Sequence, residues 1–335
     1  MVVYRHLDVE HLEWSLRRHA RRETGRRLIA TDSVFSMDGD LAPLETIVEL
    51  ARAYAARLVV DEAHATGALG PGGRGALAQA GLHAEADVLV GTLGKALGSY
   101  GAFVCADAQM VRYLINASRS LIFSTAPSPP AVAGALAALE LLQERPRRIE
   151  RLHSNARVLR GALSREGFAV AGEGIHIVPL IVGEEDRAMD LCQAAIERGV
   201  FAQAIRPPTV PEGSSRLRLA ATASHTAADM RMAAGVLGDA ARELGLDPAT
   251  IGSSSSAPED AEDADEGQEL DTPWPVASPS SGPFDFERGE EPTFQRGEEA
   301  TWAAVSASAT PPAPVGAARP HAPFDGERES SIRAA

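Results

Sequence analysis

The segment Asp87-Val-Leu-Val-Gly-Thr-Leu-Gly-Lys95-Ala-Leu-Gly98 is an apolar run that ends in a glycine-punctuated turn. It predicts a buried strand that delivers Lys95 to that turn. Lys95 is the only lysine in the chain, and all the other basic residues among its 32 lysines and arginines are arginine. Because a guanidinium cannot lose its proton and condense with a carbonyl, a Schiff base would require this lysine.

Strands and helices alternate on both sides of this segment. Buried strands are expected at 27–31, 57–61, 87–91 and 101–106, and helices at 8–24, 44–56 and 129–143. Continuous apolar strands that alternate with helices indicate an α/β protein with a mainly parallel sheet. In such sheets functional side chains collect at the carboxyl ends of the strands, which is where Ser33, Asp61 and Lys95 stand.

A smaller α+β unit is expected after residue 144, with helices at 145–165, 186–198 and 227–244 and strands at 175–182 and 216–219. The segment 251–335 has 17 acidic and 5 basic side chains and 11 of the 22 prolines. Such a composition cannot bury enough apolar area to order itself. We therefore predict part of a large domain over 1–144, a small domain over 145–250 and a disordered acidic tail over 251–335.

Charge and composition exclude several classes of protein. The chain carries a net charge of −14, of which the tail supplies −12, so residues 1–250 are almost neutral and offer no basic surface for nucleic acid. The sequence has no apolar run of membrane-spanning length and does not start like a signal peptide. Cys105 and Cys192 lie in apolar patterns without metal-ligand spacing, which predicts buried free thiols, no metal site and a cytoplasmic location.

Asp61 and His64 are the candidate partners of Lys95. An unpaired carboxylate at the end of an apolar strand is costly, and a protonated pyridine nitrogen, such as that of pyridoxal 5′-phosphate, would explain Asp61. As an alternative to a cofactor role, Asp61 could cap the turn that follows it, and Lys95 could be a solvated loop residue. The hydroxyl of Thr92 could donate a hydrogen bond to a phosphate group. A nucleotide-binding P-loop is excluded, because Ala96 stands where that motif requires Ser or Thr.

Four stretches, at 32–44, 60–67, 73–75 and 91–98, resemble the α-oxoamine synthases. These are fold-type I pyridoxal-phosphate enzymes that condense an amino acid with an acyl thioester and release CO2. The resemblance covers about residues 1–245 and implies that Lys95 forms the Schiff base and Asp61 holds the ring nitrogen. It further implies cofactor contacts from His64, Ser33 and Thr92, and from Ser124 and Thr125 across a homodimer interface.

The substrates implied by the resemblance depend on the segment 205–219. Ile205-Arg-Pro-Pro-Thr-Val-Pro211 and Arg216-Leu-Arg-Leu219 are most similar to members that join L-alanine to a pimeloyl thioester, carried by CoA or an acyl carrier protein, in biotin synthesis. Arg218 would then hold the alanine carboxylate and Thr209 would contact substrate. Without such a role, Arg218 would be a surface arginine and Thr209 a threonine in a proline-rich turn. The turn around Lys95 is also typical of members that join glycine to acetyl-CoA.

Members of this family have a long further stretch before the position that Met1 matches. It carries a histidine that stacks on the cofactor ring, a helix start that binds the phosphate and an arginine near the substrate. The resemblance therefore implies an N-terminally truncated chain. A non-catalytic fragment or pseudoenzyme that pairs with a full-length homologue is the third hypothesis.

Overall fold

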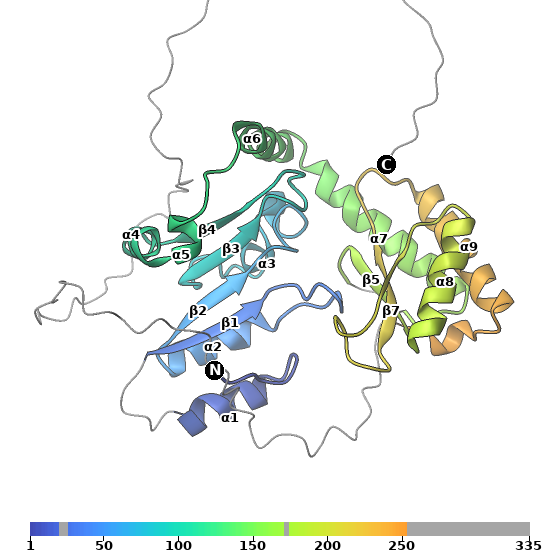
Figure 1. Cartoon of the computed structure of the whole chain (residues 1–335), viewed down its shortest axis with the longest axis horizontal. Helices are drawn as coiled ribbons and strands as arrows, with labels where there is room; N and C mark the ends of the chain where they lie inside the picture. The colour runs from blue at the N-terminus through green and yellow to red at the C-terminus, as the bar shows by residue number, and fades with distance from the viewer. Residues whose placement is uncertain (20–25, 171–173, 253–335) are drawn as a thin grey trace, which may run out of the picture. The chain divides into compact units, whose positions relative to one another are not determined.

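The computed structural model describes residues 1–19, 26–170 and 174–252 (Figure 1). Its first sheet has the order β1-β2-β3-β4 and consists of β1 (Arg27–Asp32), β2 (Ala56–Asp61), β3 (Val88–Thr92) and β4 (Ala102–Ala106). The strands β1, β2 and β3 run parallel, and β4 pairs antiparallel with β3. The predicted α/β fold with a mainly parallel sheet is thereby confirmed.

Helices cover one face of this sheet. The strand side chains Ile29, Leu58 and Val60 are buried there in a core cluster. The helices that add side chains to this cluster are α1 (Val9–His19), α2 (Leu44–Ala53) and α3 (Ala76–Gln79), through Leu12, Ile47 and Leu77 among others. The sheet is therefore held by apolar packing from one side, with α2 and α3 behind it in Figure 1.

Two predicted helices have different ends in the structure. The helix predicted over 44–56 ends at Ala53, because Ala55 takes the left-handed conformation with φ of 49° and turns the chain into β2 at Ala56. The helix predicted over 8–24 ends at His19, and residues 20–25 lie outside the described part.

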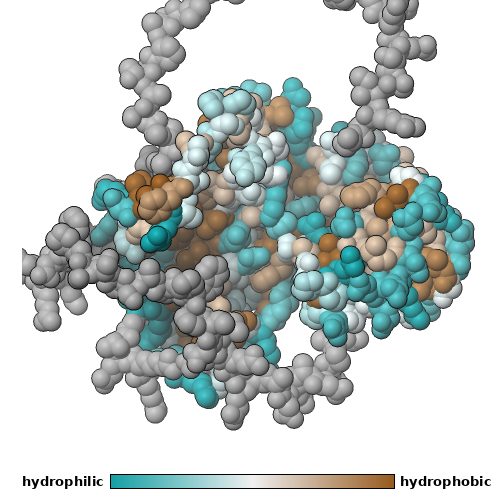
Figure 2. All heavy atoms as spheres, in the orientation of Figure 1, coloured by the Kyte–Doolittle hydropathy of each residue, from teal (hydrophilic) through white to brown (hydrophobic). Residues whose placement is uncertain are grey.

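The chain after β4 forms α4 (Ala108–Ala117), α5 (Arg119–Ile122) and α6 (Pro129–Glu144), of which only α6 is predicted by the sequence. Asp107 caps α4 by accepting a hydrogen bond of 2.7 Å from the Met110 amide. Neither α4 nor α5 buries any residue, and α6 buries only Ala135. Figure 2 shows hydrophobic side chains at the surface where α4 and α5 lie.

A second sheet has the order β5-β7-β6 and is antiparallel throughout. Its strands are β5 (Ile177–Gly183), β6 (Gln203–Ile205) and β7 (Ser215–Ala220). They share a core with α7 (Arg147–Arg165), α8 (Glu185–Glu197) and α9 (Ala227–Glu243). The sequence predicts all of these except β6, which is too short for an alternating pattern. Short 3₁₀ turns lie at Pro71–Gly73 and Pro248–Thr250.

Ile251 and Gly252, which the sequence assigns to the tail, pack on the second sheet. Ile251 is 2% exposed, and the Ile181 amide donates to the Gly252 carbonyl at 2.7 Å. The rest of the predicted disordered tail, 253–335, lies outside the described residues, and the division into domains stays a prediction. The expectation that both thiols are buried is wrong for Cys105, which is half-buried on β4, and right for Cys192. No described helix has the length and apolarity to cross a membrane.

Candidate active site

The carboxyl ends of β1, β2 and β3 bring Asp32, Asp61 and Thr92 to one edge of the first sheet. Asp32 and Asp61 are register partners in the parallel pair of strands, whose backbones lie about 4.8 Å apart. The Ser33 amide donates to the Asp61 carbonyl at 2.8 Å and continues the ladder beyond the strands. Because both carboxylates belong to the last residue of a strand, the edge is strongly acidic.

Asp61 and Glu62 are consecutive carboxylates with different surroundings. Asp61 is half-buried, and its Oδ1 atom accepts a hydrogen bond of 2.7 Å from the Ala63 amide. Glu62 is fully buried and accepts the amides of Ala76 and Leu77, each at 2.8 Å. Burial raises the pKa of Glu62, and these amides act against that rise. Glu62 therefore has a structural role, which leaves Asp61 for chemistry.

Lys95 lies in the turn after β3, close enough to Asp61, Asp32 and Arg218 to interact with all three charges. Partial loss of hydration is the largest cause that lowers the pKa of the Lys95 amine, while Asp61 and Asp32 act to raise it. The Lys95 side chain itself is exposed among the described residues, although the strand before it is largely shielded. The turn itself is closed by the Gly98 amide, which donates to the Lys95 carbonyl at 2.9 Å.

Asp32 interacts electrostatically with both Asp61 and Lys95 at this edge. Burial is the main cause that raises the pKa of Asp32, and the neighbouring Asp61 raises it further. Lys95 opposes both effects. Two adjacent carboxylates beside one lysine can stabilise a cationic group bound between them.

Two histidines lie next to this group of charges. Burial, together with the charges of Lys95 and Arg218, lowers the pKa of His64 to about 4. The pKa of His176, just before β5, is also lowered to about 4, by burial and by His64, Arg218, His153 and Arg160. The Nδ1 atom of His176 is buried without a hydrogen-bond partner in the described part of the chain. Both imidazoles are therefore neutral at physiological pH.

Arg216 and Arg218 attach β7 to the loop after β1. Arg218 donates from Nε to the Ser36 carbonyl, and burial lowers the pKa of its guanidinium. Arg216 is 3% exposed and donates to the Met37 carbonyl at 3.2 Å and to Asp38 at 2.6 Å. These contacts bring a guanidinium from the second sheet to the acidic edge of the first.

The residues predicted from sequence divide into two groups. Lys95 interacts electrostatically with Asp61, His64 and Arg218, and Thr92 ends the strand that precedes it. The Thr92 hydroxyl donates to the Gly101 carbonyl at 3.2 Å and accepts from the Gly94 amide at 3.1 Å, while buried Ser33 donates its hydroxyl to the Asp61 carbonyl. Ser124, Thr125 and Thr209 are exposed and have no described contact with Lys95, Asp61, His64 or Arg218. Their binding roles, like those of the other predicted residues, stay predictions.

Asp32, Glu62 and His176 are the site residues that the sequence analysis missed. Asp32 directly follows the strand predicted over 27–31 and ends the observed strand β1, so its position was a usable signal. His176 lies 112 positions from His64, and only the folded chain places them within electrostatic reach. Arg160 fixes the backbone around His176, because its guanidinium donates to the carbonyls of Ile175 and Ile177.

The buried imidazole of His176 predicts a pH-dependent stability. An unfolded histidine takes up a proton as the pH falls through about 6.5, whereas folded His176 stays neutral until about pH 4. The free energy of unfolding therefore decreases as the pH is lowered across this window. In His176→Asn we expect the free energy of unfolding to decrease by about 2 kcal/mol less than in the wild type between about pH 6.5 and about pH 4, a value that allows for the partial exposure of His176. Urea unfolding at each pH measures this difference. His83→Asn, at an exposed position, serves as control and should keep the wild-type slope. An unchanged slope in His176→Asn would contradict the buried neutral state.

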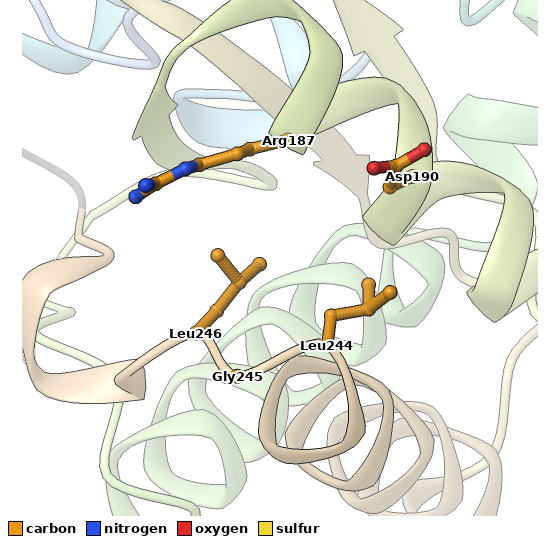
Figure 3. A pocket seen from close by; sticks show the side chains of 5 residues that line it. All are labelled: Arg187, Asp190, Leu244, Gly245 and Leu246. Carbon is orange, nitrogen blue, oxygen red and sulfur yellow. The ribbon is translucent and has the colours of Figure 1, made fainter.

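Two other features lie apart from this site. His6, Asp38 and Asp40 have possible ligand atoms within 4.8 Å of one another, but Asp38 is paired with Arg216, and His6 bonds Asp40 at 2.8 Å. A pocket between α8 and the residues after α9 is lined by Arg187, Asp190, Leu244, Gly245 and Leu246 (Figure 3). None of the charged residues at the strand ends lines it.

Comparisons with known proteins agree with the resemblance found in the sequence. A putative 8-amino-7-oxononanoate synthase of Geobacillus kaustophilus is 48% identical over 244 residues, which are 72% of this chain and 62% of the relative. An 8-amino-7-oxononanoate synthase of Geobacter sulfurreducens is 46% identical and covers 73% of this chain and 63% of its own length. The chain thus spans a little over three fifths of the length of these curated relatives.

Solved structures show the same fold. Serine palmitoyltransferase from S. paucimobilis, with a bound pyridoxal-phosphate–myriocin aldimine, superposes with a TM-score of 0.68 at 34% identity, over 72% of this chain and 61% of that one. The 8-amino-7-oxononanoate synthase of Francisella tularensis superposes with a TM-score of 0.60 at 24% identity, over 72% of this chain and 69% of that one, and supports the fold alone. The predicted fold type is confirmed. The model of the family "Aminotransferase class I and II" matches residues 1–237, and the chain belongs to this family.

Proposed function

We propose that this chain carries the catalytic groups of a pyridoxal-phosphate enzyme that condenses L-alanine with a pimeloyl thioester. The products would be 8-amino-7-oxononanoate, CO2 and the free thiol, as a step of biotin synthesis. The observation that carries the proposal is the grouping of the single lysine, Lys95, with Asp61 and Arg218 at one sheet edge. Curated relatives named 8-amino-7-oxononanoate synthase support the choice of reaction.

The residues at the strand ends fit pyridoxal phosphate. A cationic ring nitrogen suits the acidic edge formed by Asp61 and Asp32, and an aldehyde suits an amine whose pKa is lowered, as in Lys95. When bound there, the cofactor supplies an electron sink for the negative charge that develops on the amino-acid α-carbon. Solved relatives with bound pyridoxal phosphate support this assignment.

Each of the chain's own residues would then have a separate role in the reaction. The negative charge of Asp61 would favour the protonated ring nitrogen, and the Ala63 amide, which donates to its Oδ1 atom, orients the carboxylate. Arg218 binds the planar carboxylate of alanine through its guanidinium, which the Ser36 carbonyl orients. The Lys95 amine would take the α-proton as the general base, and the partial loss of hydration that lowers its pKa favours this role. Neutral His64 offers a hydrogen bond without adding charge.

The other hypotheses are less well supported. Joining glycine to acetyl-CoA remains compatible with the turn around Lys95, but the relatives described above bear the name of the oxononanoate synthase. Parallel assays of alanine with pimeloyl-CoA and of glycine with acetyl-CoA separate the two. A non-catalytic fragment would turn over neither pair.

Covalent capture of pyridoxal phosphate tests the proposal directly. After incubation and borohydride reduction, we expect the cofactor mass on the peptide that contains Lys95, located by mass spectrometry. Since Lys95 is the only lysine, the only other reactive amine is the amino terminus of Met1, which lies in a different peptide. Lys95→Arg keeps the positive charge and should lose the label. A label on Met1 alone in the wild-type chain would refute the role of Lys95.

We also propose a homodimer in the cytoplasm. Support for a second copy comes from the exposed segment after α5, where Phe123 is 77% exposed next to Ser124 and Thr125. In a homodimer these two hydroxyls would contact the phosphate of the neighbouring subunit, as the sequence resemblance implies. The free thiols of Cys105 and Cys192 fit a reducing compartment.

A further inference from the structure

The helix α7 and the residue just before it carry a local excess of positive charge. Residues 145–165 contain seven arginines and a single acidic residue, Glu150. Arg160 is buried and holds backbone carbonyls. The other six are exposed, and we call them the α7 arginines: Arg145, Arg147, Arg148, Arg151, Arg157 and Arg165. Residues 1–250 are almost neutral in total, so the total charge conceals this positive surface.

The α7 arginines have no carboxylate partner in the described part of the chain, although several arginines elsewhere on the surface are paired with glutamates. Arg151 donates to the His225 carbonyl at 3.3 Å, which leaves its charge unbalanced. Arg147 and Arg148 lie in the first turn of the helix, where the helix dipole disfavours positive charge. Helix stability therefore does not account for these arginines, whereas a negatively charged ligand would.

The opposite side of α7 fixes the direction in which these arginines point. Leu152, Leu159 and Leu163 are buried in the core that α7 shares with the second sheet. Residues four apart lie one above the other on a helix, so Arg147 and Arg151 are neighbours on the solvent side. The helix is continuous over its 19 residues (Figure 1). The α7 arginines therefore form a positive surface on a rigid element.

The acidic charge of the chain is concentrated in residues 259–271, which we call the acidic run. It has eight carboxylates and no basic side chain. We infer that the acidic run binds the α7 arginines of the same chain. Opposite charges attract the two segments, and the covalent connection keeps them at a high effective concentration. The inference does not rest on the proposed function.

The connection is long enough for this contact. The described part of the chain stops at Gly252, near the carboxyl end of α7, because the Ala169 amide donates to the Ile251 carbonyl at 2.9 Å and α7 ends at Arg165. From that end α7 extends about 27 Å back to its first residue. When extended, residues 253–258 span about 20 Å and the acidic run spans about 43 Å. The acidic run can therefore reach along the whole of α7.

Two other ligands could occupy the α7 arginines. Nucleic acid binds exposed arginines through the same electrostatic attraction, but it would have to displace a segment held at an effective concentration of about 1 mM. The acidic run of a second copy could also bind, in which case the contact would depend on protein concentration. Each of these ligands gives a distinct experimental result.

The first experiment measures how fast phenylglyoxal modifies each arginine of the full chain, with mass spectrometry as the readout. The test variant changes the eight carboxylates of the acidic run to the corresponding amides. We expect the α7 arginines to react several-fold faster in this variant than in the wild type at low salt. Exposed Arg187 on α8 and Arg231 on α9 should react at unchanged rates. Salt at about 0.5 M should abolish the difference, because it shortens the Debye length.

A matched control variant makes the same change at eight other carboxylates and alters the net charge equally. They are Asp285, Glu287, Glu290, Glu291, Glu298, Glu299, Asp325 and Glu327. This variant should keep the wild-type modification rates. Equal acceleration of the α7 arginines in both variants, or in neither, would overturn the inference. So would equal acceleration at Arg187 and Arg231, since it would indicate a diffuse attraction without a defined surface.

The reciprocal experiment measures cleavage of the acidic run by a glutamate-specific protease. Changing Arg147, Arg148 and Arg157 to glutamine should speed this cleavage several-fold, while cleavage after Glu298 keeps its rate. Arg187→Gln is the matched control and should change neither rate. These arginines have no side-chain contact in the described residues, so thermal unfolding should be unchanged. Unchanged cleavage of the acidic run in the triple variant would contradict the inference.

Concentration and nucleic acid distinguish the other ligands. Shielding of the α7 arginines that increases with protein concentration would assign the surface to the acidic run of a second copy. Retention of duplex DNA by the wild-type chain at about 0.15 M salt, with loss of binding when the α7 arginines are changed, would assign it to nucleic acid. Either result would overturn the inference, whereas shielding that is independent of concentration supports it.

Discussion

Replacing Gly75 with alanine is expected to lower the free energy of unfolding by about 4 kcal/mol, a loss typical of broken buried networks. Gly75 has φ of 102°, and a Cβ atom there would lie 2.2 Å from Oε2 of Glu62. Glu62 is fully buried and accepts the amides of Ala76 and Leu77, so it cannot move without leaving a carboxylate unpaired. Urea unfolding of wild type and variant measures the loss.

Gly72→Ala is the matched control for that experiment. Gly72 lies in the same loop and has φ of 61°, but a Cβ atom there would meet nothing within 4 Å. Only the left-handed conformation then opposes alanine, at a cost of about 1 kcal/mol. Equal losses in the two variants would mean that backbone conformation, and not the Glu62 contact, makes glycine necessary at position 75.

Asp61→Asn is expected to weaken the binding of pyridoxal phosphate at least about 100-fold, because it removes one partner of a partly buried charge pair. The substitution keeps an oxygen that can accept the Ala63 amide, so the local turn should persist. The reason for the loss is electrostatic, since a neutral amide cannot stabilise a protonated ring nitrogen. Titration followed by visible absorption gives the dissociation constant.

Asp32→Asn is the comparison for Asp61→Asn, because the two residues are register partners at adjacent strand ends. We expect a loss of about tenfold or less, since Asp32 would act on the cation from one strand further away. A larger loss in Asp32→Asn than in Asp61→Asn would exchange the roles of the two carboxylates. Equal and small losses would argue against a cationic ligand at this edge.

Local patterns allowed much of the first sheet and part of the site to be predicted. The strands ending at Asp61 and Thr92 are short apolar runs followed by glycine-rich turns, so position along the chain predicted that Ser33, Asp61 and Lys95 stand at one edge. The helix α4 has apolar residues at helical spacing, Met110, Val111, Leu114 and Ile115, so the sequence carried a signal for it that was missed, whereas α5 is only four residues long. His176 is close to His64 only through the packing of β5, which no local pattern reports.

The exposure of Lys95 could not be predicted for a different reason. An apolar strand before a turn indicates burial of the strand, but the environment of the turn depends on what lies over the sheet. The helices α1, α2 and α3 pack on the far face, so nothing they contribute shields the lysine. The position of Asp32 next to a predicted strand could have been used in the same way as that of Asp61. The structure adds that Asp32 and Asp61 are register partners and therefore lie side by side.

The arginines of β7 bind the loop after β1 mainly through its backbone. Arg218 holds the carbonyl of Ser36 and Arg216 that of Met37, so neither of these contacts depends on which side chains the loop carries at positions 36 and 37. Gly39 is the exception nearby, because a Cβ atom there would lie 2.7 Å from the Ile177 carbonyl oxygen. Substitutions at 36 and 37 can therefore change the side chains that this loop presents, while the backbone contacts that position the guanidinium groups of Arg216 and Arg218 are kept.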